Sequence, residues 1–224
     1  MSYFRGQAEQ DKFVLQTLGF KRNGTFLEIG SNNAIEINNT YVLEHEYDWR
    51  GIMIEYDSKW LPQYKVHRPK SIHVIQDATT IDYKKLLDSS GLPKAFDYLQ
   101  IDLEVNNRST LTVLEKLDAE VLDTYTFSTV TFEHDIYRGN FFDTRKVSRD
   151  IFERRGYIRV FGDICNRESK YPYEDWYVHP DHVDMDYISE LRKRNEENYK
   201  SSSIIGSSLG WDSIVYPILL KRPT

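Results

Sequence analysis

Acidic residues that end successive predicted strands are the side chains of this sequence best placed to do chemistry. Glu55 ends GIMIE, Asp77 closely follows SIHVI, and Asp102 ends FDYLQID. The strand before them, TFLEIG, ends at Gly30 and leads into a turn of small polar residues. The carboxyl ends of parallel strands meet at one edge of an open sheet, where ligands bind. We therefore expect these four positions to border one pocket.

The same positions predict an adenosine-containing ligand that carries no phosphate. Glu55 follows the Gly30 turn at the distance where nucleoside-binding folds place an acid that holds the ribose hydroxyls. Asp77 could accept a hydrogen bond from an adenine amino group. No glycine lies between Gly30 and Gly51, so the glycine-rich pyrophosphate cradle is missing and a Rossmann dehydrogenase is disfavoured. S-adenosylmethionine is the cofactor that fits. One strand-final acid is commonly a helix cap, but three in this order are harder to explain that way.

A second group of ionisable residues follows the fourth and fifth predicted strands. FDYLQIDLE supplies Asp102 and Glu104, and TFEHD supplies Glu133, His134 and Asp135. If the two strands are neighbours, these groups converge beside the cofactor and perturb each other's pKa values, as in an active site. The alternative reading makes Asp102 a helix cap and His134 a hydrogen-bonded loop histidine.

Two mechanisms remain open for this cluster. In the first, Asp102, Glu133 and either His134 or Asp135 hold Mg²⁺ or Mn²⁺, which suit carboxylate oxygen ligands. In the second there is no metal, and His134 or Asp102 is the general base. Other classes also stay open, namely methylation of another small molecule or of a protein side chain, and a nucleoside-binding domain without catalysis.

Short apolar runs that alternate with helical patterns must position these residues. Such alternation predicts an α/β fold with a mainly parallel sheet and helices on both faces. Seven strands are expected, at residues 25–30, 51–56, 71–75, 96–102, 125–132, 157–162 and 212–220. Helices are expected at residues 8–18, 38–47, 59–67, 83–87, 109–117, 144–155 and 186–200. Pro217 in the last strand indicates an edge or irregular position, and this strand could run antiparallel.

The chain is expected to form one domain, 1–224. Residues 1–24 would form an N-terminal helical cap, and residues 166–210 an insertion on the substrate side. Within it, YPYEDWYVHPDHVD (171–184) would overhang the functional edge, although Trp176 could instead pack against the core. The charged segment 186–200 is expected to be a solvated helix or the contact of a homodimer.

Composition limits the class of protein. The chain has 224 residues, 40% hydrophobic and 29% charged, a formal net charge of −6 and one cysteine, Cys165. Such a length suits one α/β domain, and a single cysteine cannot form an internal disulfide. Apolar windows are too short for a transmembrane helix, and the early charges of MSYFRGQAEQDK argue against a signal peptide. Because clustered cations are lacking, nucleic acid is a poor partner. We expect a cytoplasmic protein that binds neither nucleic acid nor membrane.

The sequence resembles the FkbM-type methyltransferases, a family of class I S-adenosylmethionine-dependent enzymes. The resemblance is carried by QDKFVLQTLGFKRNGTFLEIGSNNAIEINNTYVLEHEYDWRGIMIEYD, FDYLQIDLE, TFEHD and YEDWYVHP, and spans residues 7–180. It implies a Rossmann-like seven-stranded fold with the last strand antiparallel, and methyl transfer mostly to oxygen. Family members act on sugar hydroxyls of surface glycans, antibiotics and viral capsid glycans. TFEHD is most similar to glycan-modifying members, including those of large DNA viruses, in which case the compartment would be the host cytoplasm.

The resemblance also implies roles for individual residues. The cofactor turn would consist of Glu28, Gly30, Ser31 and Asn32, and the ribose would be held by Glu55 with Tyr56. The adenine would contact Asp77 and Ala78. The segments over the methionine end would contribute Gln10, Asp11, Asn39 and Thr40. Asp102 is expected to contact cofactor as well. The sequence departs from the family pattern at two places: Ala34 replaces the second glycine of the turn, and Val105 and Asn106 replace a glycine after the fourth strand.

The aromatic content favours a carbohydrate or glycoside acceptor. The chain has 16 Tyr, 11 Phe and 4 Trp, and flat rings with polar rims suit the faces and hydroxyl edges of sugars. Aromatic residues in or beside the predicted open edge are Tyr41, Tyr56, Tyr137, Tyr171, Tyr173, Trp176 and Tyr177. We expect Glu104, Tyr137 and Trp176 to contact a sugar such as rhamnose.

Overall fold

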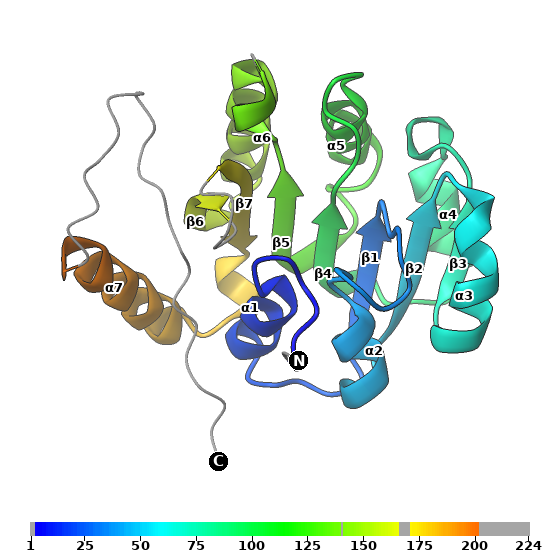
Figure 1. Cartoon of the computed structure of the whole chain (residues 1–224), viewed down its shortest axis with the longest axis horizontal. Coiled ribbons are helices and arrows are strands. Elements are labelled where there is room, and N and C mark those ends of the chain that lie inside the picture. Colours follow the sequence, from blue (N-terminus) through cyan, green and yellow to red (C-terminus); the bar gives the residue numbers. More distant parts are fainter. Residues whose placement is uncertain (1–2, 140, 166–170, 202–224) are drawn as a thin grey trace.

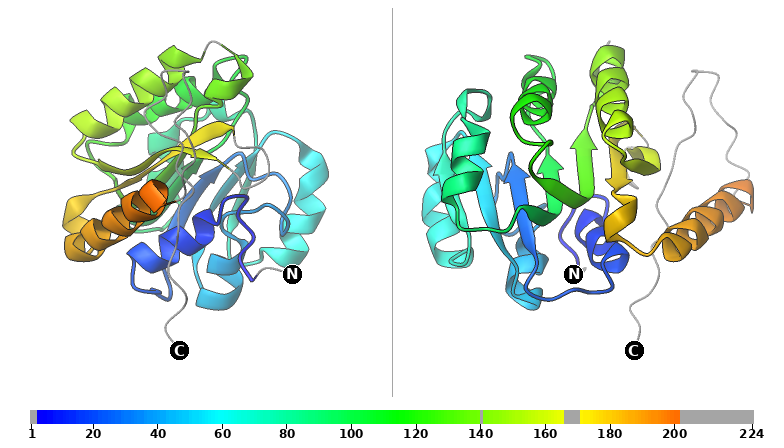
Figure 2. Two further views of the ribbon diagram at one scale, coloured as in Figure 1. Left: turned by 60° about the vertical axis from the view of Figure 1, so that its left-hand side comes forward. Right: turned by 180° about the vertical axis from the view of Figure 1, so that it is seen from behind.

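The computed structural model describes residues 3–139, 141–165 and 171–201, which form a seven-stranded sheet between two layers of helices (Figures 1 and 2). The strands are β1 (Thr25–Ile29), β2 (Arg50–Glu55), β3 (Ile72–Ile75), β4 (Ala95–Ile101), β5 (Thr126–Glu133), β6 (Ile158–Cys165) and β7 (Pro172–Val178). Their order across the sheet is β3-β2-β1-β4-β5-β7-β6. The first five are parallel, and β7 is antiparallel to both of its neighbours. This confirms the predicted fold class.

The helices divide between the two faces of the sheet. The α-helices are α1 (Gln10–Thr17), α2 (Tyr41–Tyr47), α3 (Leu61–His67), α4 (Tyr83–Ser89), α5 (Ser109–Glu120), α6 (Phe142–Arg154) and α7 (Met185–Ser201). Short 3-10 turns are η1 (Ser58–Trp60), η2 (Ala78–Thr80), η3 (Ile136–Arg138) and η4 (Pro180–His182). Side chains from α1, α2, α3 and α7 share one apolar cluster, and those from α4, α5 and α6 share the other. Within the described residues, no helix has the length and apolarity to span a bilayer.

The central strands carry the two cores because successive side chains of a strand point to opposite faces. In β1 every residue is buried; Phe26 joins the cluster beneath α1 and α2, whereas Leu27 joins the one beneath α4, α5 and α6. The arrows of β1, β2, β4 and β5 point to one edge in Figure 1, and that of β7 points the other way. The carboxyl edge of the parallel strands therefore also receives the beginning of β7.

The seventh strand of the described sheet corrects the sequence-based expectation. The predicted strand 212–220 lies outside the described residues, and Pro172–Val178, expected to be an overhanging loop, is buried along its whole length as β7. Trp176 is fully buried, with its ring 4.7 Å from Phe13 and 5.9 Å from Phe161, centroid to centroid. The expectation that Trp176 contacts a substrate is therefore wrong in this structure, because the ring belongs to the core.

Candidate active site at the carboxyl edge of the sheet

The turn after β1 is held by the ends of neighbouring strands. The backbone N–H groups of Gly30 and Ser31 donate to the carbonyl oxygen of Ile54, at 2.9 and 3.1 Å. Gly30 has a φ of +89°, and a Cβ atom there would lie 1.8 Å from the carbonyl oxygen of Asp102. Close packing between the ends of β1 and β4 therefore requires glycine at this position.

Glu55 joins this turn to the end of β2. Its carboxylate accepts hydrogen bonds from the backbone N–H groups of Asn32, at 2.8 Å, and Asp57, at 2.9 Å. Asn32 has a φ of +49°, and the hydroxyl of Tyr64 donates to its carbonyl oxygen. The structure thus brings Glu55 and the glycine turn together at the carboxyl edge, as expected for a shared ligand site.

The loop between β1 and α2, residues 31–40, is fastened by one buried guanidinium. Arg68 is fully buried and donates to Glu44 Oε2 at 3.0 Å, Asn38 Oδ1 at 2.8 Å and Thr40 Oγ1 at 2.6 Å. The Asn38 amide in turn donates to the carbonyl oxygen of Ser31 at 3.0 Å. Sequence reasoning missed Arg68, because a lone arginine after a helix carries no pattern.

Glu28 and Thr40 belong to this loop support. Thr40 Oγ1 donates to Glu28 Oε1 at 2.9 Å, and both side chains are buried. Burial raises the pKa of Glu28, and the charge of Arg68 and the Thr40 hydrogen bond only partly offset that rise. In this structure the side chains of Glu28 and Thr40 face the protein and hold the loop, and their contact with a cofactor stays a prediction.

Asp77 lies just after the end of β3, the strand next to β2, which carries Glu55. Its Oδ1 accepts hydrogen bonds from the Thr79 backbone N–H at 2.9 Å and the Thr79 hydroxyl at 2.7 Å. These bonds lower the pKa of Asp77, so its exposed carboxylate is charged at neutral pH. Tyr56, after Glu55, is 77% exposed, whereas the side chain of Ala78 is buried.

Three carboxyl groups stand in a row across β4, β5 and β7. In the β4–β5 register Ile101 pairs with Phe132, which puts Asp102 beside Glu133. Glu133 is the direct partner of Glu174 in the antiparallel β5–β7 pair. Directly opposed side chains of neighbouring strands point to the same face. Asp102, Glu133 and Glu174 are called the carboxyl row below; Glu174 was missed in the sequence because it lay in the segment read as a loop.

Protons must be shared within the carboxyl row. Asp102 opens to solvent on one side, yet protein around its carboxyl group and the charges of Asp135 and Glu55 raise its pKa. Burial and the Asp102 charge raise the pKa of Glu133 well above its ordinary value. The raised pKa favours the protonated form of Glu133, which can share its proton with the Asp102 carboxylate. Burial and the Asp102 charge also raise the pKa of Glu174 to about 8.

His134 turns away from this row. Glu133 and His134 are consecutive at a strand end, so their side chains point to opposite faces. The Nδ1 atom of His134 accepts from the Ile136 backbone N–H at 3.3 Å, and Nε2 lies 3.5 Å from Asp163 Oδ1 and 3.4 Å from Asp175 Oδ1. The ring is fully buried. His134 therefore cannot reach an acceptor and is not the general base.

The predicted metal set is not assembled. Among the residues that the structure describes, one group of potential metal ligands has its ligand atoms within 4.8 Å of one another, and it consists of His134, Asp163 and Asp175. Asp102 and Glu133 are not part of it. Arg149 donates two hydrogen bonds to Asp175, at 2.7 and 2.9 Å, and Arg145 Nε donates to Asp163 at 2.8 Å. These guanidinium groups neutralise the two carboxylates, so the cluster is a buried ion-pair network and does not fit a divalent cation.

The far side of the edge carries exposed aromatic rings beside charged groups. Tyr137 and Tyr171 stack with ring centroids 5.2 Å apart and planes 12° from parallel, and both are exposed. Arg138 pairs with Asp135 Oδ2 at 2.9 Å and lies 3.7 Å from Glu104 Oε1. The predicted residues Glu104, Asp135 and Tyr137 thus lie together next to Glu133.

The beginning of α1 reaches the carboxyl row. Gln10 Nε2 donates to Glu174 Oε2 at 2.9 Å and to the Tyr173 hydroxyl at 3.3 Å, so Gln10 lies at this edge but its amide is bound to protein. Trp176 Nε1 donates to the same Glu174 oxygen at 2.8 Å. Two buried acceptor atoms near this face, Gln100 Oε1 and Asn39 Oδ1, have no hydrogen-bond partner within the described chain. Such orphaned atoms suit a ligand that brings donors.

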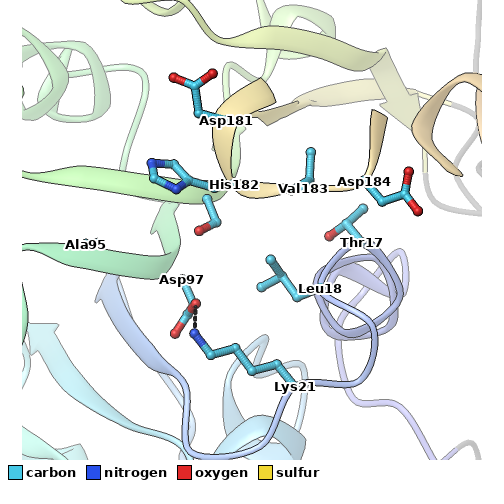
Figure 3. Close-up of a pocket in the computed structure, with 10 residues that line it drawn as sticks. Thr17, Leu18, Lys21, Ala95, Asp97, Asp181, His182, Val183 and Asp184 are labelled. Atoms are coloured by element: carbon cyan, nitrogen blue, oxygen red, sulfur yellow. Dashed lines mark hydrogen bonds and ion pairs between the residues drawn. The ribbon is translucent and has the colours of Figure 1, made fainter. Parts of the chain in front are cut away.

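A cavity of about 580 Å³ lies elsewhere, at the amino end of β4. Figure 3 shows it between the last turn of α1, the start of β4 and the η4 segment, with Lys21 bound to Asp97 at 2.6 Å. None of the predicted site residues lines it. We place the functional site at the carboxyl edge because the clustered, mutually perturbed ionisable groups are there.

Comparison with known proteins supports the fold. No protein family and no curated protein sequence matches the chain. Among solved structures, a putative rRNA-methylase from Clostridium thermocellum superimposes with a TM-score of 0.52 and 10% identity, over 80% of this chain and 99% of that one. The METTL16 MTase domain does so with a TM-score of 0.50 and 11% identity, over 79% and 67%. The chain has the Rossmann-like fold of these methyltransferases.

Proposed function

We propose that this protein is an S-adenosylmethionine-dependent O-methyltransferase whose acceptor is a sugar hydroxyl, such as that of the deoxysugar rhamnose in a glycan. The methyltransferase fold and the sequence resemblance to the FkbM-type enzymes support the general activity. The paired carboxyl groups of Asp102 and Glu133 carry the proposal, because a site that only binds a nucleoside has no need of them.

The residues at the carboxyl edge fit the cofactor. Glu55 and the charged Asp77 would accept hydrogen bonds from ribose hydroxyls and an adenine amino group, and the exposed ring of Tyr56 offers an apolar face beside them. Gln100 Oε1 and Asn39 Oδ1 are buried acceptors without a partner, which suits the ammonium group of the methionine end. When bound, S-adenosylmethionine supplies a methyl group activated by its sulfonium charge.

The protein's own part in transfer is alignment and removal of one proton. Fixing the acceptor oxygen in line with the methyl group can supply about 7–11 kcal/mol of the barrier. As the oxygen–methyl bond forms and the sulfur–methyl bond breaks, the hydroxyl proton passes to the Asp102 carboxylate. Glu133 stabilises that carboxylate by hydrogen bonding. A positioned base of this kind contributes typically about 10²–10⁴-fold to the rate.

A sugar is the favoured acceptor because of the surface beside the base. The stacked Tyr137 and Tyr171 offer a broad exposed ring surface, which suits the apolar face of a pyranose. Asp135 and Glu104 next to them are hydrogen-bond acceptors for sugar hydroxyls. No step in this scheme passes through a metal ion.

Transfer of a labelled methyl group to rhamnose, fucose and xylose glycosides tests the proposal. Asp102→Asn should lower kcat by about 10²-fold or more while S-adenosylhomocysteine still binds, as measured by calorimetry. Asp150→Asn, on the exposed surface of α6, is the matched control. Wild-type turnover in Asp102→Asn would remove the assigned base. Transfer only to other small molecules or to protein side chains would reject the sugar, and cofactor binding without transfer to any of these acceptors would indicate a binding domain.

A further inference from the structure

We propose that the acceptor sugar is uncharged when it is methylated, and that the site rejects the same sugar while it is joined to a nucleoside diphosphate. This inference rests on the proposed function and narrows its substrate. It follows from the charges at the acceptor side of the edge, from the type of polar atom that is left unpaired there, and from the aromatic platform beside them.

Carboxyl groups dominate the acceptor side. Besides burial, the charges of Asp135 and Glu55 raise the pKa of Asp102, and those of Asp102 and Asp135 raise the pKa of Glu133. Glu104 extends the group outward, with its side chain about half exposed. Glu174 lies behind them, buried. Asp102, Asp135 and Glu104 place carboxylates around the position where an acceptor must sit, and Arg138 is the cation beside the last two.

Of the cations near this edge, those that the structure describes in ion pairs include Arg138, Arg108 and Lys59. Arg138 pairs with Asp135 at 2.9 Å and approaches Glu104 at 3.7 Å. Arg108, in the loop after β4, pairs with Glu115 at 3.0 Å, and Lys59, after β2, pairs with Asp57 at 2.7 Å. A diphosphate needs unpaired cations or a helix N-terminus to replace its hydration. To bind here it would have to take Arg138 from two carboxylates and still face their charge.

A carboxylate oxygen of Asp135, beside the place of the acceptor sugar, has no hydrogen-bond donor among the described residues. Asp135 is 3% exposed, and its Oδ1 has no hydrogen-bond partner in the described part of the chain, while Oδ2 binds Arg138. Asp135 lies close enough to Glu133 to raise the pKa of its carboxyl group. A ligand group that fits this atom must donate a hydrogen bond, as a sugar hydroxyl does.

The consequence concerns the order of reactions. A sugar enters glycans from a nucleoside diphosphate carrier, and the anionic group is lost when a glycosyl transfer joins it to the glycan. If this site rejects the charged form, that glycosyl transfer must come first and supply the substrate. Repulsion built in against a competing ligand is a common source of specificity.

The test offers the enzyme one sugar in two forms. The probes are the methyl glycoside of a deoxyhexose and its nucleoside diphosphate, for rhamnose and for fucose, with labelled S-adenosylmethionine. We expect kcat/KM for the glycoside to exceed that for the charged form by about 100-fold or more at low salt. The ratio should shrink as added salt screens the carboxylates. Glu104→Lys should reduce the ratio of the two kcat/KM values by about tenfold. The control Glu153→Lys, near the last residue of α6, should leave this ratio unchanged.

The outcomes separate this inference from the proposal on which it rests. Equal or preferred use of the nucleoside diphosphate sugar by the wild-type protein overturns the inference and leaves sugar O-methylation standing. An unchanged ratio in Glu104→Lys removes the charge argument. If neither form accepts a methyl group although S-adenosylmethionine binds, the sugar acceptor itself is wrong, and the inference falls with it.

Discussion

Replacing Arg68 by methionine should destabilise the protein and loosen the loop 31–40. The substitution keeps most of the side-chain volume but removes the guanidinium that binds Glu44, Asn38 and Thr40. Glu44 is 2% exposed and Glu28 1% exposed, so both carboxyl groups would lose their buried countercharge. Breaking a buried ion pair by removing one partner costs about 3–5 kcal/mol.

The size of this effect is measurable in two ways. For a domain of this length, each kcal/mol corresponds to about 2–4 °C in Tm, so urea and thermal unfolding of Arg68→Met should both show a clear loss. Amide hydrogen exchange should increase in residues 31–40 more than in β1 beneath them. The affinity for S-adenosylmethionine should fall with the order of the loop, because Arg68 itself is buried and only positions the residues above it.

A matched substitution on the surface provides the control. Arg22 forms an ion pair with Asp48 at 2.7 Å, but its side chain is 56% exposed. Exposed ion pairs contribute little to stability, so Arg22→Met should unfold like the wild type. If Arg68→Met is as stable as Arg22→Met, the buried network does not hold the fold. If it is destabilised but exchange in 31–40 is unaltered, the assigned role in the loop is refuted.

Three further predictions follow from the ionisable groups. The charge of Asp135 contributes to the raised pKa of Asp102, so Asp135→Asn should lower that pKa and move the acid limb of the kcat/KM profile to lower pH; movement to higher pH would contradict the assignment of Asp102 as base. Glu174 has a pKa of about 8 against an ordinary value of 4.5, so the folded state keeps a proton that the unfolded state loses. The free energy of unfolding of the wild type should therefore fall as pH rises from about 4.5 through about 8, by up to about 5 kcal/mol more than that of Glu174→Gln. Urea unfolding of both proteins at pH 5 and pH 9 measures this difference. An equal change in the two proteins between these pH values would contradict the prediction. Methyl transfer should survive treatment with EDTA, because among the described residues Asp102 and Glu133 do not assemble as ligands with either His134 or Asp135; loss of activity that Mg²⁺ or Mn²⁺ restores would reinstate the metal mechanism.

The strands that the sequence could identify are those whose burial shows in a short apolar run. β1, β2 and β4 are bounded within one residue of their predicted ends, because parallel strands covered on both faces consist largely of apolar residues. β7 was missed because Glu174 and Asp175 interrupt its apolar run. Their partners are Gln10 on α1 and Arg149 on α6, far away in the sequence. Only the folded chain shows that these acids can be buried.

The sequence also predicted part of the candidate site. Residues at strand ends, such as Glu55, Asp77 and Asp102, could be placed because topology alone brings such ends to one edge. The direction of each side chain was harder to predict. The alternation of strand side chains already separates Glu133 from His134, and applying it would have excluded the metal set that joined them. Arg68 had no signal in the sequence, since its importance lies in contacts with Asn38 and Thr40 of the loop and with Glu44 of α2, which come 24–30 residues earlier.

The position of β7 between β5 and β6 also bears on how the protein folds during synthesis. β6 is made first but has β7 as its neighbour in the described sheet, so it has no strand to pair with until residues 172–178 have emerged. The five parallel strands can meanwhile form from nearby βα units, whose contacts are local and fast to make. Glu174 and the Tyr173 carbonyl, which receives the backbone N–H groups of His134 and Asp135, arrive only with β7. Until then a nascent chain would display an unpaired β5 edge and an incomplete carboxyl row, and this is the interval in which it is most exposed to aggregation.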